Sequence, residues 1–232
     1  MERNNFVEYL YVIRYEGFCK KFKIRLASDR MGFCESHFKK DPPYWAALDF
    51  YKCGECPLES SSSPCCPAAL SIAEIVEEFK GVKSFQQVEA EVVTPERKTV
   101  GTVTAQTALS SIMGLCLALS GCPILKELAP MARFHLPFST IEETMYRAAG
   151  NYLLRQYYIY KSGDEPDWDL DGLRVFYNRV ARVNTCLAER IRESVDEDAG
   201  INAVIILDNY AKNVEYLFES SLEKIRKYFS FY

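Results

Sequence analysis

Cysteine is the residue type with the clearest capacity for chemistry in this chain, because four of its nine cysteines lie within fourteen residues. Cys53 and Cys56 have the C-x2-C spacing with which one tight turn presents two thiolates to a single metal ion. Cys65 and Cys66 precede Pro67, where a helix is predicted to begin, and a helix N-terminus favours the thiolate that metal binding requires. The pattern predicts a metal site on this loop.

The loop supplies three of the four ligands of a tetrahedral site, and Cys122 is the favoured fourth. Cys122 stands directly before a proline, as Cys56 and Cys66 also do. The predicted ligand set is therefore Cys53, Cys56, Cys66 and Cys122. Thiolate ligands in this number favour zinc, and an iron–sulfur cluster on the same four cysteines is the alternative.

Other residues are alternative candidates for completing the site. Cys34 and His37 precede the C-x2-C pair, and the two pairs together have the two-knuckle spacing of a zinc ribbon. Cys65 or His135 is the remaining choice. The other three cysteines are predicted to be ordinary buried residues of a reducing compartment: Cys19, Cys116 and Cys186.

Patterns for other kinds of catalysis are weak. The chain has two histidines and no P-loop, G-x-G-x-x-G, G-x-S-x-G or H-E-x-x-H motif. Glu143, Arg147 and Arg155 recur at helical spacing, which is typical of a solvated face with an ion pair. The alternative is an anion or enzyme site on this Arg/Glu face, joined by Arg179 and Arg182 of the next helix.

Composition and charge exclude several classes of protein. Apolar residues make up 48% and charged residues 26% of the 232 residues, the balance of a globular protein that folds without disulfides. A formal net charge of -4 argues against nucleic-acid binding. Residues 99–125 carry no charge, but their Ser, Thr and Gly content favours a buried helix over a membrane span. The first residues lack an apolar signal region, so we expect a cytoplasmic protein.

Alternating hydrophobicity predicts an antiparallel sheet in the N-terminal part. The predicted strands are 9–15, 22–26, 33–38, 88–93 and 99–103. Glu16-Gly17 suits a hairpin turn between the first two strands. A helix from Pro67 to about Lys80 interrupts the series of strands.

From residue 104 onward the chain is predicted to be helical. The predicted helices are 105–119, 124–128, 139–161, 173–197 and 201–229. Ser139 and Glu142 have the spacing of a capping box for the third of these. The last two are predicted to pack as an antiparallel pair, and aromatic residues occur at 228–232. This pair is expected to mediate self-association or to bind a protein partner.

The sequence therefore predicts an α+β fold, in which a small antiparallel N-terminal sheet with a Cys-rich metal loop precedes a mainly helical C-terminal bundle. The mixed part is residues 1–103 and the helical part is residues 104–232, as two domains or one.

The motifs Cys53-x2-Cys56-Pro57-Leu58, Cys66-Pro67 and Ser120-Gly121-Cys122-Pro123 resemble those of an uncharacterised bacterial protein family of unknown function. The likeness covers about residues 45–160. It implies a bacterial cytosolic protein with no assigned activity, and it groups the four favoured cysteines as one set. The pair Cys34 and His37 does not belong to the motif.

The leading functional hypothesis is an interaction or assembly module in which a structural zinc ion ties the cysteine loop to the helical body. A redox or sensing protein, with an iron–sulfur cluster or a redox-sensitive zinc ion on the same cysteines, is the second hypothesis. An enzyme of unknown class that uses the Arg/Glu helix face is the third.

Overall fold

The structure is a computed structural model that describes residues 6–27, 41–79, 81–194, 206, 220 and 222–230. The predicted strand at 33–38 and the candidate ligands Cys34 and His37 lie outside the described residues. The zinc-ribbon alternative that depends on these two residues therefore stays a prediction.

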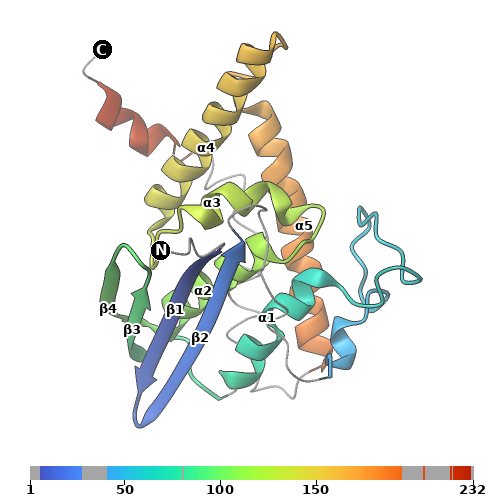
Figure 1. Ribbon diagram of the computed structural model, residues 1–232, viewed down its shortest axis with the longest axis vertical. Helices are drawn as coiled ribbons and strands as arrows, with labels where there is room; N and C mark the ends of the chain where they lie inside the picture. Colours follow the sequence, from blue (N-terminus) through green and yellow to red (C-terminus); the bar gives the residue numbers. More distant parts are fainter. Residues whose placement is uncertain are drawn as a thin grey trace.

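A four-stranded antiparallel sheet forms the N-terminal part, with the strand order β2-β1-β3-β4 (Figure 1). Its strands are β1 (Phe6–Tyr15), β2 (Phe18–Ala27), β3 (Gln87–Val93) and β4 (Lys98–Thr104). Glu16 and Gly17 close the β1–β2 hairpin with φ values of 41° and 81°, the left-handed conformation that a two-residue hairpin turn requires. Alternate residues of the central strands are buried: Tyr9, Tyr11, Ile13, Val88, Ala90 and Val92. These four predicted strands are confirmed.

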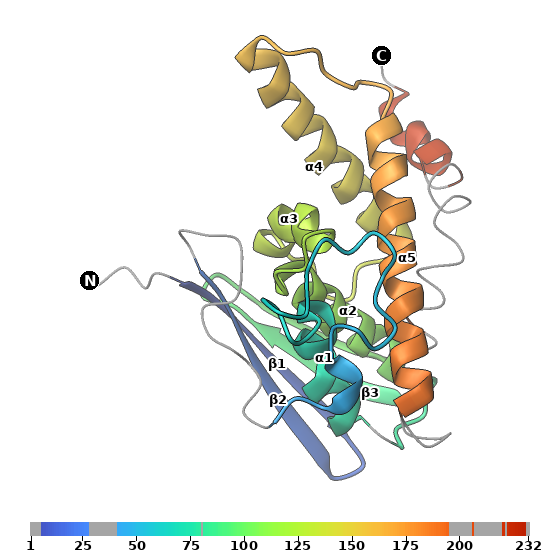
Figure 2. The ribbon, with the colours of Figure 1, turned by 90° about the vertical axis from the view of Figure 1, so that its right-hand side faces the viewer.

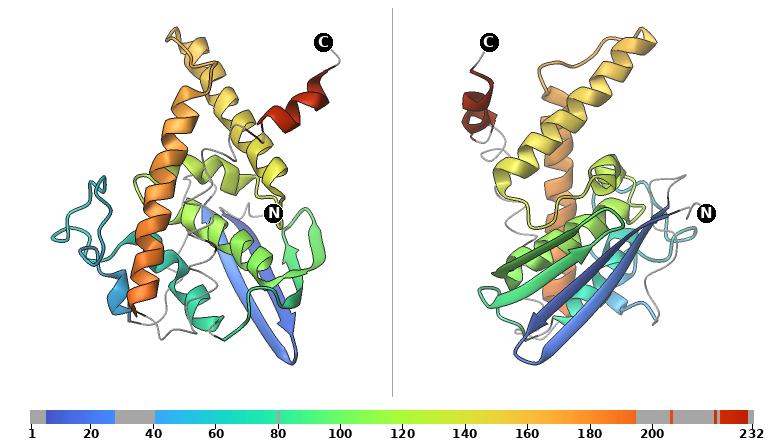
Figure 3. Two further views of the ribbon diagram at one scale, coloured as in Figure 1. Left: turned by 180° about the vertical axis from the view of Figure 1, so that it is seen from behind. Right: turned by 60° about the vertical axis from the view of Figure 1, so that its left-hand side comes forward.

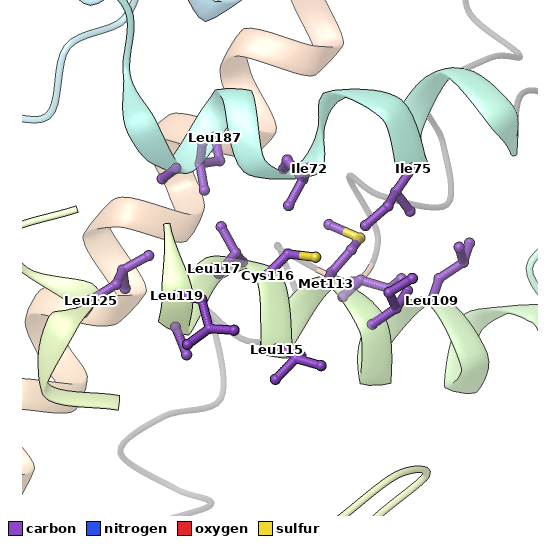
Figure 4. Close-up of a cluster of buried hydrophobic side chains, with 14 of the residues drawn as sticks. Ile72, Ile75, Leu109, Met113, Leu115, Cys116, Leu117, Leu119, Leu125 and Leu187 are labelled. Carbon is purple, nitrogen blue, oxygen red and sulfur yellow. The ribbon is translucent and has the colours of Figure 1, made fainter. Parts of the chain in front are cut away.

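Two helices, α1 (Pro67–Glu78) and α2 (Ala105–Leu119), pack against each other on one face of the sheet (Figure 2). Their apolar contact is shown in Figure 4, where Ile72 of α1 faces Cys116 and Met113 of α2. Most residues of α2 are buried, which confirms the prediction of a buried central helix. None of the helices that the structure describes is long and apolar enough to cross a membrane.

The remaining helices connect or project from this layer. They are η1 (Tyr44–Ala46), η2 (Leu125–Leu128), α3 (Ala129–Arg133), α4 (Ile141–Ser162), α5 (Asp171–Ser194) and η3 (Lys227–Phe229). The α1–α2 layer separates α5 from the sheet, and α4 projects beyond it (Figure 2). The capping box of α4 begins at Thr140 and not at Ser139, because Thr140 and Glu143 each accept the backbone N–H of the other.

One apolar cluster contains residues of the sheet, α1, α2 and α5, and so includes residues on both sides of position 103. The α+β class is confirmed, while the division into two parts stays a prediction. Most of the predicted helix 201–229 lies outside the described residues. Phe229 stacks on Tyr146 of α4 with 6.5 Å between ring centroids, so this aromatic residue of the C-terminal segment contacts the chain's own body.

Candidate metal centre

The C-x2-C turn belongs to a loop that lies beside α5 (Figure 3). The backbone N–H of Cys56 donates to the carbonyl oxygen of Cys53 at 3.0 Å, which closes the turn. Glu55, between the two cysteines, accepts a hydrogen bond from Arg179 Nε at 3.1 Å and also pairs with Arg182. Because both arginines belong to α5, ion pairs fix the turn to that helix.

Cys66 is positioned by the end of the same loop. Its backbone N–H donates to the carbonyl oxygen of Ala46 at 2.7 Å, and Leu48 N–H donates to Pro64 at 2.9 Å. These bonds join the segment Ala46–Leu48 to the segment Pro64–Cys66. Cys66 is the N-cap of α1, and Pro67 occupies the first helical position. The predicted start of this helix is confirmed, and Cys66 is buried there.

Arg190 of α5 is 1% exposed and holds the first of these segments. Its guanidinium donates to the carbonyl oxygens of Trp45, Ala47 and Leu48 at 2.6–2.9 Å. Within the described residues Arg190 Nε has no hydrogen-bond partner, and no carboxylate pairs with the guanidinium. A buried guanidinium favours negative charge nearby.

Cys122 reaches the same region from the end of α2. Gly121, with a φ of 80°, turns the chain directly after the helix. Burial raises the pKa of the Cys122 thiol, and the backbone N–H groups of Leu125 and Ile124, which donate to the sulfur, oppose this shift. Such donors stabilise a thiolate, which is the form that binds a metal.

The four cysteines predicted as ligands lie near one another, although they come from three segments. The Cys53 thiol interacts electrostatically with those of Cys66 and Cys122, and Cys122 interacts with Cys56 and Cys66. None of the described cysteines is in a disulfide. As the side chains stand, the described residues contain no group of three Cys, His, Asp or Glu that could hold a metal ion. Side-chain rotation is therefore needed to bring the sulfurs into a ligand set.

A fifth thiol, which the sequence reasoning assigned to the core, joins this group. Cys186 of α5 is half-buried, and its thiol interacts with that of Cys53. This interaction raises the pKa of Cys53 and lowers that of Cys186. The signal that would have found Cys186 is its spacing, since it lies one turn from both Arg182 and Arg190 on one stripe of α5.

The other predicted candidates lie elsewhere or have other contacts. Cys65 is half-buried and pairs through its backbone with Ala47. His135 Nε2 lies 2.5 Å from Tyr11 Oη, in a network outside the cysteine group. The expectation that Cys19 is buried is wrong, because its position on the β2 edge strand leaves it exposed, whereas Cys116 is buried in α2 as predicted.

The network around His135 is a second polar cluster next to the core. Ser111 Oγ lies 2.8 Å from Tyr11 Oη and 3.3 Å from His135 Nε2, and it accepts the Phe138 N–H at 3.2 Å. Burial of the imidazole lowers the pKa of His135 to about 3, and burial raises the pKa of Tyr11. His135 is therefore neutral at physiological pH, and a hydrogen bond joins its Nε2 to Tyr11 Oη.

The predicted Arg/Glu face of α4 is occupied by structural contacts. Glu143 completes the capping box, and Arg147 Nη2 donates to the carbonyl oxygens of Met131 and Phe134 at 2.8 Å. Arg155 pairs with Glu127 at 2.7 Å. Arg179 and Arg182, which were candidates to join this face, pair instead with the C-x2-C turn.

Five reduced thiols from four segments and backbone N–H donors to one sulfur are chemically compatible with a thiolate-bound metal ion, although no three of the described Cys, His, Asp or Glu side chains could hold one as they stand. Zinc and iron–sulfur clusters both accept these ligands.

Comparison with known proteins identifies a family. No curated protein and no solved structure matches the chain. The model of one family, described as Domain of unknown function (DUF6901), matches residues 7–230, which extends well beyond the region of likeness expected from the motifs. The expectation of an uncharacterised family is thereby confirmed, and the chain belongs to the family Domain of unknown function (DUF6901).

Proposed function

We propose that this protein is a zinc-stabilised interaction module in which Cys53, Cys56, Cys66 and Cys122 hold one structural zinc ion. The observation that carries the proposal is the proximity of these thiols, which come from three segments and interact electrostatically. When bound, zinc supplies a rigid cross-link among these segments. The chain's own residues supply the orientation and the charge balance.

Charge balance supports thiolate ligands at this place. Four thiolates and one zinc ion carry a net charge of about -2, which needs nearby cations in a buried setting. Arg190 supplies a buried positive charge one helical turn from Cys186, and Arg179 and Arg182 supply two more at the C-x2-C turn. Arg190 is also the group that lacks a carboxylate partner among the described residues. The positive charge of Arg190 would offset part of the negative charge of a filled site.

The proposed zinc ion would join a loop with little regular structure to the helical body. Residues 47–66 contain no helix or strand beyond the isolated bridge at Ala47 and Cys65. Such a loop depends on ion pairs and a few backbone bonds, which are individually weak. A bound ion would fix its conformation and with it the start of α1.

A surface that could bind a protein partner lies away from the proposed zinc site, on the projecting part of α4 and the loop after it. Large side chains there are 46–64% exposed: Leu154, Tyr157, Tyr158, Tyr160 and Trp168. Aromatic residues of this kind are enriched at protein interfaces. Binding of a protein partner or a second copy of the chain is therefore the role we assign to the α4 end of the molecule. Light scattering of the wild type and a Tyr158→Ser, Tyr160→Ser variant tests self-association, which an unchanged monomeric mass in both would exclude.

Elemental analysis of the purified full chain tests the metal site. We expect one zinc ion per chain, which falls to near zero in Cys66→Ser and in Cys122→Ser. Cys116→Ser is the matched control, because Cys116 is a buried cysteine of α2 outside the cluster, and it should keep its zinc.

Two results would contradict the proposal. Full zinc content in both Cys66→Ser and Cys122→Ser would show that the ligand set is wrong. A brown protein with visible absorbance and bound iron would replace zinc by an iron–sulfur cluster on the same cysteines.

A further inference from the structure

We propose that two copies of this protein pair along their β4 strands, antiparallel to each other, so that the two four-stranded sheets become one continuous sheet. The strand β4 (Lys98–Thr104) is the last in the sheet order and lies at an open edge of the sheet (Figure 1). This surface is separate from the proposed zinc site and from the α4 end, and the inference depends on neither of them.

The backbone of β4 has hydrogen-bonding groups on the side away from β3. At one end of the β3–β4 hairpin the Thr94 N–H donates to the carbonyl oxygen of Arg97 at 2.9 Å, and at the other the Ala105 N–H donates to that of Gln86 at 2.7 Å. Because bonding alternates along an antiparallel pair, the odd-numbered residues of β4 bond to β3. The backbone groups that point to the open edge therefore belong to the even-numbered residues: Lys98, Val100, Thr102 and Thr104. Among the described strands, none pairs with this edge.

The two edges of the sheet differ in their protection against pairing. Free edge strands are commonly protected by charged side chains, a proline or a bulge. The strand β2, at the other edge, contains four cations in ten residues: Lys20, Lys21, Lys23 and Arg25. In contrast, β4 has no proline, carries its one charge at Lys98, and pairs with β3 one to one along all of its described residues. Like charges therefore oppose the pairing of two β2 strands, while β4 lacks this protection.

The sequence of β4 suits a second copy of itself as the partner. In an antiparallel pair centred on Gly101, the Gly101 residues of the two copies lie opposite each other. Val100 then lies opposite Thr102 of the second copy. Thr99 likewise lies opposite Val103. The facing residues are thus β-branched on both sides of the central glycines, and such cross-strand pairs stabilise a sheet.

Charge favours the antiparallel arrangement over the parallel one. Lys98 is the one charged residue of β4, and its Nζ lies 2.9 Å from a carboxylate oxygen of Glu91 in its own chain. The antiparallel pair puts the two Lys98 residues about 20 Å apart, which exceeds the screening length of about 8 Å at physiological ionic strength. A parallel pair would put them side by side. The charge therefore selects the two-fold symmetric pair.

Apolar side chains lie on both faces of β4. On the solvent face, Val100 is 63% exposed. On the face toward the helices, Phe138 Cδ2 lies 3.9 Å from the position that a Cβ atom would take at Gly101. Phe138 has a φ of 58°, a left-handed conformation that is costly for a residue other than glycine, and its N–H donates to Ser111 Oγ at 3.2 Å. In the pair, the two Phe138 rings would cover the two facing glycines.

Sedimentation velocity of the full chain over a range of concentrations tests the inference. We expect a monomer–dimer equilibrium with a Kd in the micromolar range, since a strand-to-strand contact is a small interface. Val100→Lys brings two like charges close together across the pair and should raise this Kd about tenfold or more. Thr102→Pro should do the same, because it removes an N–H at the open edge and keeps the bonds to β3.

Val175→Lys is the matched control for the added charge. Val175 is 59% exposed on α5, which the α1–α2 layer separates from the sheet (Figure 2), so this variant should associate as the wild type does. Hydrogen exchange at low and high protein concentration locates the interface without any substitution. We expect exchange of the amides in residues 98–104 to slow at high concentration.

Three results would overturn the inference. The first is a monomer at every concentration. The second is association that leaves exchange in residues 98–104 unchanged. The third is association that is lost in the Tyr158→Ser, Tyr160→Ser variant and kept in Val100→Lys, because the contact would then lie at the α4 end. None of these results bears on the proposed zinc site, which elemental analysis tests separately.

Discussion

Two polar clusters lie at the edge of the same apolar core, and their contacts differ in kind. In the Tyr11–Ser111–His135 network, each polar side-chain atom discussed above has a hydrogen-bond partner within the chain. In the cysteine cluster, thiols and a guanidinium gather, and Arg190 Nε is a buried polar atom that has no partner among the described residues. The polar atoms of the Tyr11–Ser111–His135 network bind one another, whereas we propose that the cysteine cluster binds a metal ion.

The difference teaches how buried polar groups separate structure from function. A buried network whose donors and acceptors all pair stabilises one conformation and needs nothing else. In the cysteine cluster, the part of the chain that the structure describes leaves one buried donor without a partner, which agrees with the proposal of a metal site there. Each of the following experiments perturbs one cluster and uses the other as its reference.

Removal of zinc is expected to have the largest effect. If zinc is present at about a thousand times its Kd, a strong chelator should lower the free energy of unfolding by about 4 kcal/mol. Thermal denaturation with and without chelator measures this loss. A Ser111→Ala variant should respond to the chelator as the wild type does. Identical melting curves for the wild type under both conditions would remove zinc from the account of stability.

Arg190→Met is expected to destabilise the protein by about 3 kcal/mol, because three carbonyl oxygens, those of Trp45 and Leu48 in buried hydrogen bonds and that of Ala47 in a partly buried one, lose their donor. It should also lower zinc affinity, since the buried positive charge is lost. Arg174→Met on the same helix is the control, because within the part of the chain that the structure describes the Arg174 side chain makes an exposed ion pair with Asp171 and no buried one. Denaturant unfolding and zinc titration of both variants measure the effects. Equal stability of the two variants would contradict a stabilising role for the hydrogen bonds that Arg190 donates.

In the Tyr11–Ser111–His135 network, His135 makes the free energy of unfolding depend on pH. Its pKa is lowered to about 3 by burial, so below pH 6.5 the unfolded chain binds a proton that the folded chain does not. Stability is therefore fully present above that pH and falls as the pH falls, by about 2 kcal/mol between pH 6.5 and pH 5. His135→Gln should lose this part of the slope. Urea unfolding of both proteins at each pH isolates it, because the other titrating groups are common to both.

Ser111→Ala is expected to have the smallest effect, a loss of about 1 kcal/mol from the hydrogen bonds to Tyr11 and Phe138. Its zinc content should equal that of the wild type. Unfolding midpoints and elemental analysis measure the two quantities. A change in zinc content would show that the two clusters are coupled.

Sequence reasoning predicted the elements well because their signals are local. Alternating apolar residues in β1 and β3, a proline at the first position of α1, and the uncharged segment of α2 each determine a structure from neighbouring residues. The capping box was misplaced by one residue because Ser139 and Thr140 both have a suitable hydroxyl and a glutamate three residues later. Only the backbone conformation chooses between them.

The cysteine cluster was predictable only in part. Cys53 and Cys56 are paired by their spacing, and Cys66 is indicated by its place before a helix-starting proline. Cys186 was assigned to the core because nothing near it in sequence distinguishes a cysteine that faces a loop from one that faces other helices. Its neighbourhood with Cys53 depends on how α5 packs, which is a contact distant in sequence.

The sequence by itself determined the α+β class and most helix and strand limits, and it predicted a set of four cysteines as ligands of one metal ion. The tertiary structure alone decided that Arg190 is buried, that Arg179 and Arg182 pair with Glu55, and that the Cys186 thiol interacts with that of Cys53. The physical reason is that local patterns select backbone conformation, whereas charge balance and sulfur contacts arise only when distant segments pack together.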